Sequence, residues 1–248
     1  MFYYIISNLI DFNVLLILAA VIPAIILMIV VYKFDKLEKE KPSMLLKMAI
    51  FGVLSVNIAI LLERIGETVL CLFFSPEDKI YDVLLYFLVV GLSEEFAKYF
   101  LLHTGSWHNK EFNCQFDGVV YSVFVSLGFA LWENISYVLH YGFGTALLRA
   151  VTAVPGHACF GVFMGIFYGL ARGYRARGKH KAKNVCKLMA WLVPAAIHGA
   201  YDYVATVDSQ SGDWIFTGFV LVMFAVSLLL VIRMSKKDKY YPEETEDK

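Results

Sequence analysis

The sequence predicts an all-α polytopic membrane protein, a bundle of about seven transmembrane helices. Of its 248 residues, 59% are hydrophobic and 18% are charged, which leaves too few polar groups to cover a soluble domain of this length. Apolar runs close to the roughly 20 residues that a spanning helix needs recur along the whole chain. Because backbone polar groups must find partners inside the bilayer, helices are the expected spanning structure.

Seven apolar stretches define the expected spans. They lie at about 9–31, 43–65, 80–102, 117–139, 149–171, 188–206 and 214–233. The connections are short and contain no Gly/Ser-rich linker, so residues 1–248 are expected to form a single integral membrane domain. The first stretch has no convincing cleavage site and is interpreted as a retained span rather than a signal peptide.

The basic residues set the predicted orientation. Eighteen of the 22 Lys and Arg residues fall in the segments that follow the first, third, fifth and seventh stretches. Because loops rich in Lys and Arg stay in the cytoplasm, this bias predicts an N-terminus outside and a cytoplasmic C-terminus. The loop sequence RGYRARGKHKAK is expected to contact anionic membrane lipid. It lacks the interleaved aromatic residues of a single-strand nucleic-acid site, so no nucleic acid is expected as a partner.

Ionisable and amide side chains occur well inside four of the expected spans, where facing lipid would be costly. They are Glu94, Glu95 and Lys98 in the third stretch, Glu133 and Asn134 in the fourth, His157 in the fifth, and His198 and Asp202 in the sixth. Residues three or four apart share a helix face, so Glu94 can pair with Lys98 and His198 with Asp202. We expect the set to converge on one cavity inside the bundle. Nearby Gly128, Gly161, Gly165 and Trp132 are interpreted as helix-packing residues.

The excess of carboxylates leaves two solutions open. Some carboxylates could hold protons, because close pairs favour sharing one, or a divalent metal bound by His and Glu could complete the site. A purely structural role is the alternative for single residues, and Lys98 in particular could form a structural salt bridge. A proton- or cation-coupled transporter using the set as a relay is the competing function, although no inverted repeat or pair of broken helices supports it.

Four motifs in order, EEFAK, FALWEN, PGH and HGAYD, resemble the PrsW family of intramembrane proteases, which is distantly related to the CAAX-processing and bacteriocin-immunity membrane endopeptidases. The similar region runs from about Gly91 to Tyr203, within a protease-like core at about 80–206. The wider group usually has EExxxR and FxxxH. This sequence instead has Lys98 one position before that Arg, and Glu133 in place of that His, as in the PrsW pattern.

The resemblance implies a glutamate-dependent, metal-assisted or metal-free endopeptidase of the bacterial cell membrane. It implies that the enzyme makes the first cut in a single-span membrane protein, an anti-sigma factor, so that an extracytoplasmic-function sigma factor is released in a stress response. Whether zinc takes part stays open. If a metal is bound, the expected ligands are Glu133, His157 and His198.

Peptide hydrolysis itself needs an activated water, a stabiliser for the oxyanion and a proton for the leaving amine. Glu94 or Glu95 is the expected general base, and His157 is expected to share the water or bind a metal. His198, held by Asp202, is expected to donate to the oxyanion, with Asn134 as a second candidate for that role. Lys98 is expected to support the glutamates electrostatically.

Overall fold

The computed structural model describes residues 2–207 and 209–242, and the side chains from residue 14 onward. Within these ranges the chain is helical apart from loops and one isolated bridge between Cys114 and Tyr240. The helices are α1 (Phe2–Phe34), α2 (Pro42–Cys71), α3 (Tyr81–Leu84), the π-helical η1 (Leu85–Gly91), α4 (Leu92–Ser106), α5 (Gln115–Tyr141), α6 (Phe143–Val151), α7 (Ala153–Ala176), α8 (His180–Ala205) and α9 (Gln210–Lys236). Lys248, one of the residues in the charge count, lies outside the described part.

The helices follow the seven predicted stretches. The third stretch corresponds to α3, η1 and α4, which continue one another from residue 81 to residue 106, and the fifth is divided at Thr152 into α6 and α7. Within the described residues, five helical segments are long and apolar enough to cross a membrane: Val14–Phe34, Pro42–Cys71, Gln115–Tyr141, Phe143–Ala176 and Gln210–Lys236. The predicted all-α polytopic membrane protein is confirmed, and the orientation of its termini stays a prediction.

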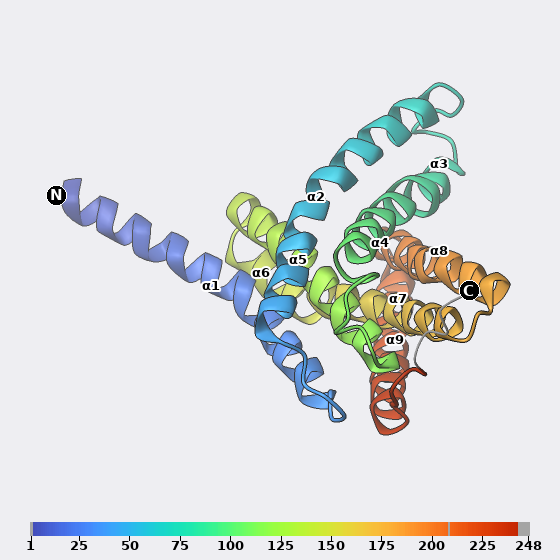
Figure 1. Cartoon of the computed structure of the whole chain (residues 1–248). Helices are drawn as coiled ribbons and strands as arrows, with labels where there is room; N and C mark the ends of the chain where they lie inside the picture. The colour runs from blue at the N-terminus through green and yellow to red at the C-terminus, as the bar shows by residue number, and fades with distance from the viewer. Residues whose placement is uncertain (1, 208, 243–248) are drawn as a thin grey trace.

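Helix α5 forms the centre of the bundle. It is packed between α2 and α7, with α1 alongside, and α8 and α9 complete the far side of α7 (Figure 1). Of the 18 most apolar consecutive residues of α5, 78% are buried. The corresponding share is 22% in α9 and in the Val14–Phe34 part of α1, whose apolar side chains face outward as expected for lipid contact.

Small residues allow this close packing. A Cβ at Gly128 of α5 would lie 2.1 Å from the Ala49 carbonyl oxygen of α2, and one at Gly165 of α7 would lie 2.4 Å from the Val119 Cα of α5. The interpretation of these glycines as packing residues is confirmed. Trp132 differs, because its side chain is half exposed and lines a cavity.

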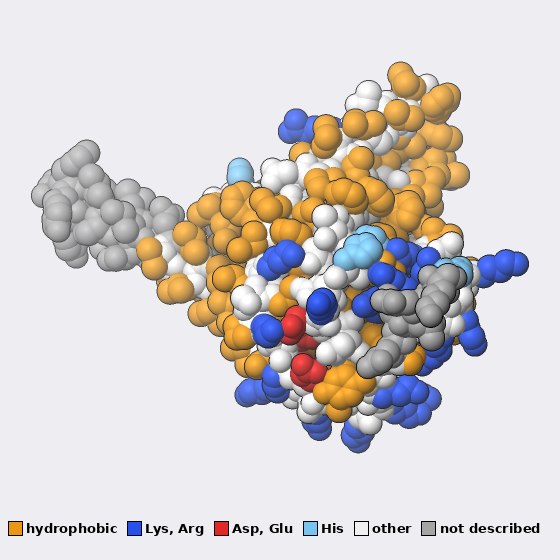
Figure 2. Space-filling model, in the orientation of Figure 1, with side chains coloured by type: hydrophobic (Ala, Val, Ile, Leu, Met, Phe, Trp, Pro, Cys, Tyr) orange, Lys and Arg blue, Asp and Glu red, His pale blue; other side chains and the backbone are white. Residues whose placement is uncertain are grey.

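Hydrophobic and basic side chains lie on different parts of the surface, as they lie in different segments of the sequence. Hydrophobic side chains cover the upper part of the face in Figure 2, and most of the Lys and Arg side chains lie along its lower and right edges. Such a division is typical of a membrane protein with a basic end at one side of the bilayer.

Candidate active site

The π-helical segment η1 lies immediately before the double-glutamate motif. A π turn inserts an extra residue and so rotates the helix that follows, and such turns are common at functional sites. Here it lies one turn before Glu94 and Glu95, which both face the interior of the bundle and are 8% and 0% exposed. The motif therefore points away from lipid although its flanks are apolar.

Helix α8 lies directly against η1. A Cβ at Gly91 would be 2.6 Å from the Ala195 carbonyl oxygen, and one at Gly199 would be 2.8 Å from the Phe87 Cα. Only glycine leaves room for this approach. The contact brings His198, the residue before Gly199, against the two glutamates of α4.

Lys98 connects the two glutamates to a third helix. Its Nζ lies 3.0 Å from Glu94 Oε2, 2.8 Å from Glu95 Oε1 and 3.1 Å from His157 Nδ1. The side chain is completely buried, and its ammonium also lies 4.0 Å from the centre of the Phe129 ring. The predicted Glu94–Lys98 pair is thus present, as part of a larger buried network.

His157 is fixed at both ring nitrogens. Because an ammonium only donates, Nδ1 accepts from Lys98, and Nε2 then carries the proton that it donates to Glu133 Oε2 over 2.8 Å. The same Glu133 oxygen lies 2.9 Å from Arg149 Nη2. Glu133 therefore orients the imidazole and is itself held by an arginine.

His198 contacts the glutamates from α8, with its ring centroid 5.4 Å from that of His157. Its Nδ1 is 2.9 Å from Glu95 Oε1 and 3.8 Å from Glu94 Oε2, and its Nε2 is 3.4 Å from Asp202 Oδ2. The ring stacks on Phe160 with centroids 4.5 Å apart. The predicted His198–Asp202 pair is present, and carboxylates face both of its nitrogens.

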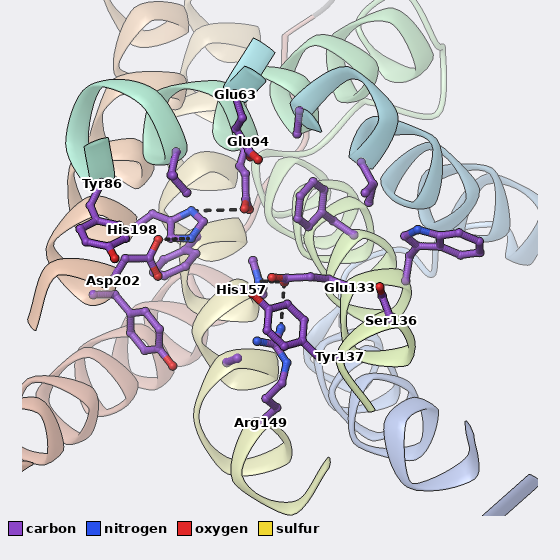
Figure 3. Close-up of a pocket in the computed structure, with 18 of the residues that line it drawn as sticks. Glu63, Tyr86, Glu94, Glu133, Ser136, Tyr137, Arg149, His157, His198 and Asp202 are labelled. Atoms are coloured by element: carbon purple, nitrogen blue, oxygen red, sulfur yellow. Dashed lines mark hydrogen bonds and ion pairs between the residues drawn. The ribbon is translucent and has the colours of Figure 1, made fainter. Parts of the chain in front are cut away.

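These residues surround a cavity of about 510 Å³, which is lined by residues of α2, η1 and α4 to α8 (Figure 3). It is lined by Glu94, His157 and His198, with Glu133 and Asp202 at its sides. Glu95 and Lys98 do not line it. They lie behind Glu94, and the Glu95 Oε2 atom is buried without a hydrogen-bond partner.

The cavity also contains polar residues that the sequence analysis did not select: Glu63, Tyr86, Ser136, Tyr137 and Arg149. Glu63 lies near the end of its apolar stretch, where a charge is unremarkable, and in Figure 3 it points from α2 toward Glu94. Arg149 is the first residue of the predicted stretch 149–171, where a charge is equally unremarkable. Only its pairing with Glu133, and its guanidinium 4.0 Å from the centre of the Tyr137 ring, place it at the site.

Asn134 is not part of the cavity lining. Its amide nitrogen donates to the Ala20 carbonyl of α1 over 2.9 Å, and its oxygen accepts from Arg149 Nε over 3.1 Å. Both ends are occupied in a fully buried side chain. Asn134 thus positions Arg149 and ties α1 to α5, rather than pointing toward a substrate.

The donor set for a metal differs from the expected one. Among the described residues in and directly behind this cavity, the donor atoms that lie within 4.8 Å of one another belong to Glu94, Glu95 and His157. Two carboxylates and an imidazole suit zinc, and the unpartnered Glu95 oxygen is available as a ligand. Since the same three residues surround the Nζ of Lys98, an ion and the ammonium would compete for one position.

A buried polar cavity that joins glutamates and histidines from five helices inside a membrane bundle is the arrangement expected of an intramembrane hydrolase. The chain matches the profile of a family described as "PrsW family intramembrane metalloprotease" over residues 40–231, and it belongs to this family. It is therefore a peptidase, rather than the transporter considered as the alternative.

Relatives support the same assignment across nearly the full chain. The chain is 33% identical to "Protease PrsW" of Geobacillus kaustophilus over 229 residues, which cover 91% of this chain and 93% of that protein. It is 32% identical to the protein of the same name from Bacillus subtilis, with 83% and 88% covered, and 31% identical to that of Clostridioides difficile, with 91% of each covered. These relatives indicate a multi-pass bacterial membrane protein. No solved structure matches the chain.

Proposed function

We propose that this peptidase makes the first cut in a single-span membrane protein, with an anti-sigma factor as substrate and release of an extracytoplasmic-function sigma factor as the result. The observation that carries the proposal is the buried cavity itself, in which Glu94 faces two histidines inside a helical bundle. An extended segment of a substrate helix, together with a water molecule, can reach these groups only from within or beside the bilayer.

Glu94 is the general base in this proposal. It lines the cavity where a water can bind, whereas Glu95 lies behind it and contacts Lys98 and His198. Glu94 takes a proton from the attacking water and delivers it to the leaving amine. The two glutamates are adjacent in the sequence and cannot be told apart there, but their different positions relative to the cavity favour Glu94 as the base.

His198 stabilises the oxyanion. In its protonated form the imidazole has an N–H at each nitrogen, and the Nδ1–H donates to Glu95. The Nε2–H lies 3.4 Å from Asp202 Oδ2, which is a weak hydrogen bond, so a substrate oxygen can replace Asp202 as the acceptor. In the metal-free form His157 holds the Lys98 ammonium beside Glu94, because its two ring nitrogens contact Lys98 and Glu133. In a zinc-dependent form, Glu94, Glu95 and His157 would hold the ion, which would supply a bound water of lowered pKa.

The test is cleavage of a co-reconstituted single-span substrate in proteoliposomes. Glu94→Gln, Glu95→Gln, His157→Ala and His198→Ala should each lower the cleavage rate by about 100-fold or more, and their combinations should be far from additive because they act as a unit. Glu67→Gln, on the exposed face of α2, is the matched control and should cleave normally. Near-normal cleavage by two or more of the four variants would disprove the assignment.

Two further measurements define the chemistry. Asp202→Asn should lose less activity than His198→Ala, because Asp202 orients the imidazole without contacting the reacting atoms. Elemental analysis of the purified protein, beside cleavage with and without chelator, separates the zinc-dependent form from the metal-free one. Cleavage that resists chelation in protein free of zinc would assign the reaction to the glutamates alone.

A further inference from the structure

A second group of carboxylates, three of them buried and one half-buried, lies far from the cavity, where the α1–α2 connection, the start of α5 and the segment after α9 meet. Its members are Asp35, Glu40, Asp117 and Asp238, here called the α5 N-terminal cluster. Asp35, Asp117 and Glu40 are 0%, 2% and 5% exposed. Asp117 precedes Glu133 on the same helix by about 24 Å at 1.5 Å per residue, so the cluster is separate from the active site.

One oxygen of each carboxylate is accounted for by local hydrogen bonds. Asp117 Oδ2 accepts the backbone N–H of Cys114 over 2.6 Å, and Asp238 Oδ1 accepts that of Phe116 over 2.9 Å, so both residues cap α5. Glu40 Oε2 accepts the Tyr121 hydroxyl over 2.5 Å, and Asp35 Oδ2 accepts the Glu40 N–H over 3.3 Å. Capping explains why acidic residues are here, but it uses only half of their oxygens.

Two of the remaining oxygens lack partners. Asp35 Oδ1 and Asp238 Oδ2 are buried with no hydrogen-bond donor. The Asp35 carboxylate is repelled by the negative charges of Asp238 and Glu38, and its own charge repels those of Asp117 and Glu40. Lys39 is the cation that acts on Asp35, and its own ammonium donates to the Tyr32 carbonyl. Buried negative charge in this excess needs a counter-charge.

The geometry suits a metal ion. One oxygen of Asp117, one of Asp238 and the Sγ of Cys114 all lie within 4.8 Å of one another. Asp35 has a completely buried and unpartnered carboxylate oxygen, and its charge acts on Asp117. Carboxylate oxygens outnumber the single sulfur, and a set dominated by oxygen favours Mg²⁺, Mn²⁺ or Ca²⁺ over zinc.

We propose that the α5 N-terminal cluster binds a divalent cation of this oxygen-preferring class, with Asp117 and Asp238 as ligands and Asp35 as the third carboxylate. The ion would join the α1–α2 connection and the segment after α9 to the start of the central helix. The segment after α9 already contacts the start of α5, because the Tyr241 N–H donates to the Asn113 carbonyl and Asp238 caps α5. The ion is structural and takes no part in peptide hydrolysis.

Protonation of the carboxylates is the other way in which their negative charge could be neutralised. Burial, reinforced by the charges of Asp238 and Glu38 and opposed by the Glu40 N–H and Lys39, raises the pKa of Asp35 to about 6. Burial and the charge of Asp35 raise the pKa of Glu40, against its hydrogen bond from Tyr121. Binding is therefore measured at several pH values from 7 to 10, because a cation must displace any protons that these carboxylates hold.

The experiment uses the purified full-length protein carrying Glu94→Gln and His157→Ala, so that the cavity donors cannot bind the probe. After treatment with chelator, Mn²⁺ is titrated and followed by electron paramagnetic resonance, and the melting temperature is recorded. One saturable Mn²⁺ equivalent is expected, with a rise in melting temperature of about 5 °C or more at saturation. Absence of saturable binding would overturn the proposal.

Variants locate the ion. Adding Asp117→Asn and Asp238→Asn should weaken Mn²⁺ binding at least 30-fold, whereas the exposed pair Asp82→Asn and Asp213→Asn should leave it unchanged. If the cluster pair fails to fold, Asp35→Asn serves instead, because it keeps the acceptor for the Glu40 N–H, and it should weaken binding at least tenfold. Unchanged Mn²⁺ binding in these variants would overturn the site.

Two more outcomes would also reject it. Cys114→Ser should bind Mn²⁺ normally, and selective zinc binding that this substitution abolishes would replace the oxygen-preferring site with a thiolate one. If Asp35→Asn raises the melting temperature of the chelator-treated protein at pH 8 and Mn²⁺ has no effect, the carboxylates are simply repelling one another and no ion is bound.

Discussion

Removing the ammonium of Lys98 tests the central electrostatic claim about the active site. Lys98→Met keeps a long side chain but leaves Glu94 and Glu95 without the cation that lies 3.0 and 2.8 Å away, and His157 without its donor at 3.1 Å. Breaking a buried ion pair by removing one partner costs about 3–5 kcal/mol. Because two carboxylates lose one cation, we expect the upper part of this range, about 4–5 kcal/mol.

The assay is reversible unfolding in mixed micelles followed by circular dichroism, beside cleavage of the single-span substrate. Lys98→Met should lose most of the activity as well as stability, and Lys98→Arg should keep part of the activity because it keeps the charge. Lys79→Met, at an exposed loop position, is the control and should change the free energy of unfolding by no more than about 0.5 kcal/mol.

A double-mutant cycle separates charge from packing. Glu95→Gln added to Lys98→Met removes one of the uncompensated carboxylates, so the double variant should be at least about 2 kcal/mol more stable than the sum of the two single effects predicts. The reasoning is refuted if Lys98→Met is fully active and as stable as the unmodified protein, or if the two changes are additive.

Three more predictions follow from the fold and the site. Reporter fusions should place the loop at Arg172–Lys187 in the cytoplasm and the loop at Pro76–Lys79 outside, and the reverse would overturn the orientation derived from basic residues. Gly165→Ala should destabilise the protein by about 1–3 kcal/mol because its Cβ would meet α5, while Gly144→Ala, which meets nothing within 4 Å, should not; equal melting temperatures would refute the packing argument. Glu133→Gln should lower the cleavage rate by about 10–100-fold, as for a residue that orients a histidine, and a loss as complete as that of Glu94→Gln would make Glu133 a ligand.

The helical bundle followed from the sequence because the bilayer imposes a simple condition. Any stretch near 20 apolar residues must satisfy its own backbone, so the seven stretches had to be helices. The same condition selected the candidate site residues: charges such as Glu94 and His198 are too costly to face lipid, so their recurrence in several spans predicted one shared cavity. Local spacing also gave the Glu94–Lys98 and His198–Asp202 pairs, since residues four apart share a helix face.

Spacing along one helix says nothing of which helices touch, at what depth and with what rotation. Those quantities come from packing, and here they depend on glycines at the α8–η1 contact and on the π turn before the glutamates. Only the tertiary structure therefore distinguished Glu94 in the cavity from Glu95 behind it, and joined Lys98 to His157. The tertiary structure also pairs Arg149, which in the sequence only begins an apolar stretch, with Glu133. It shows that the amide of Asn134 donates to Ala20 of α1. Which residues must be buried was determined by the sequence, because the cost of burial is a property of each side chain; which of them meet was decided by the tertiary structure, because contact is a property of the packed helices.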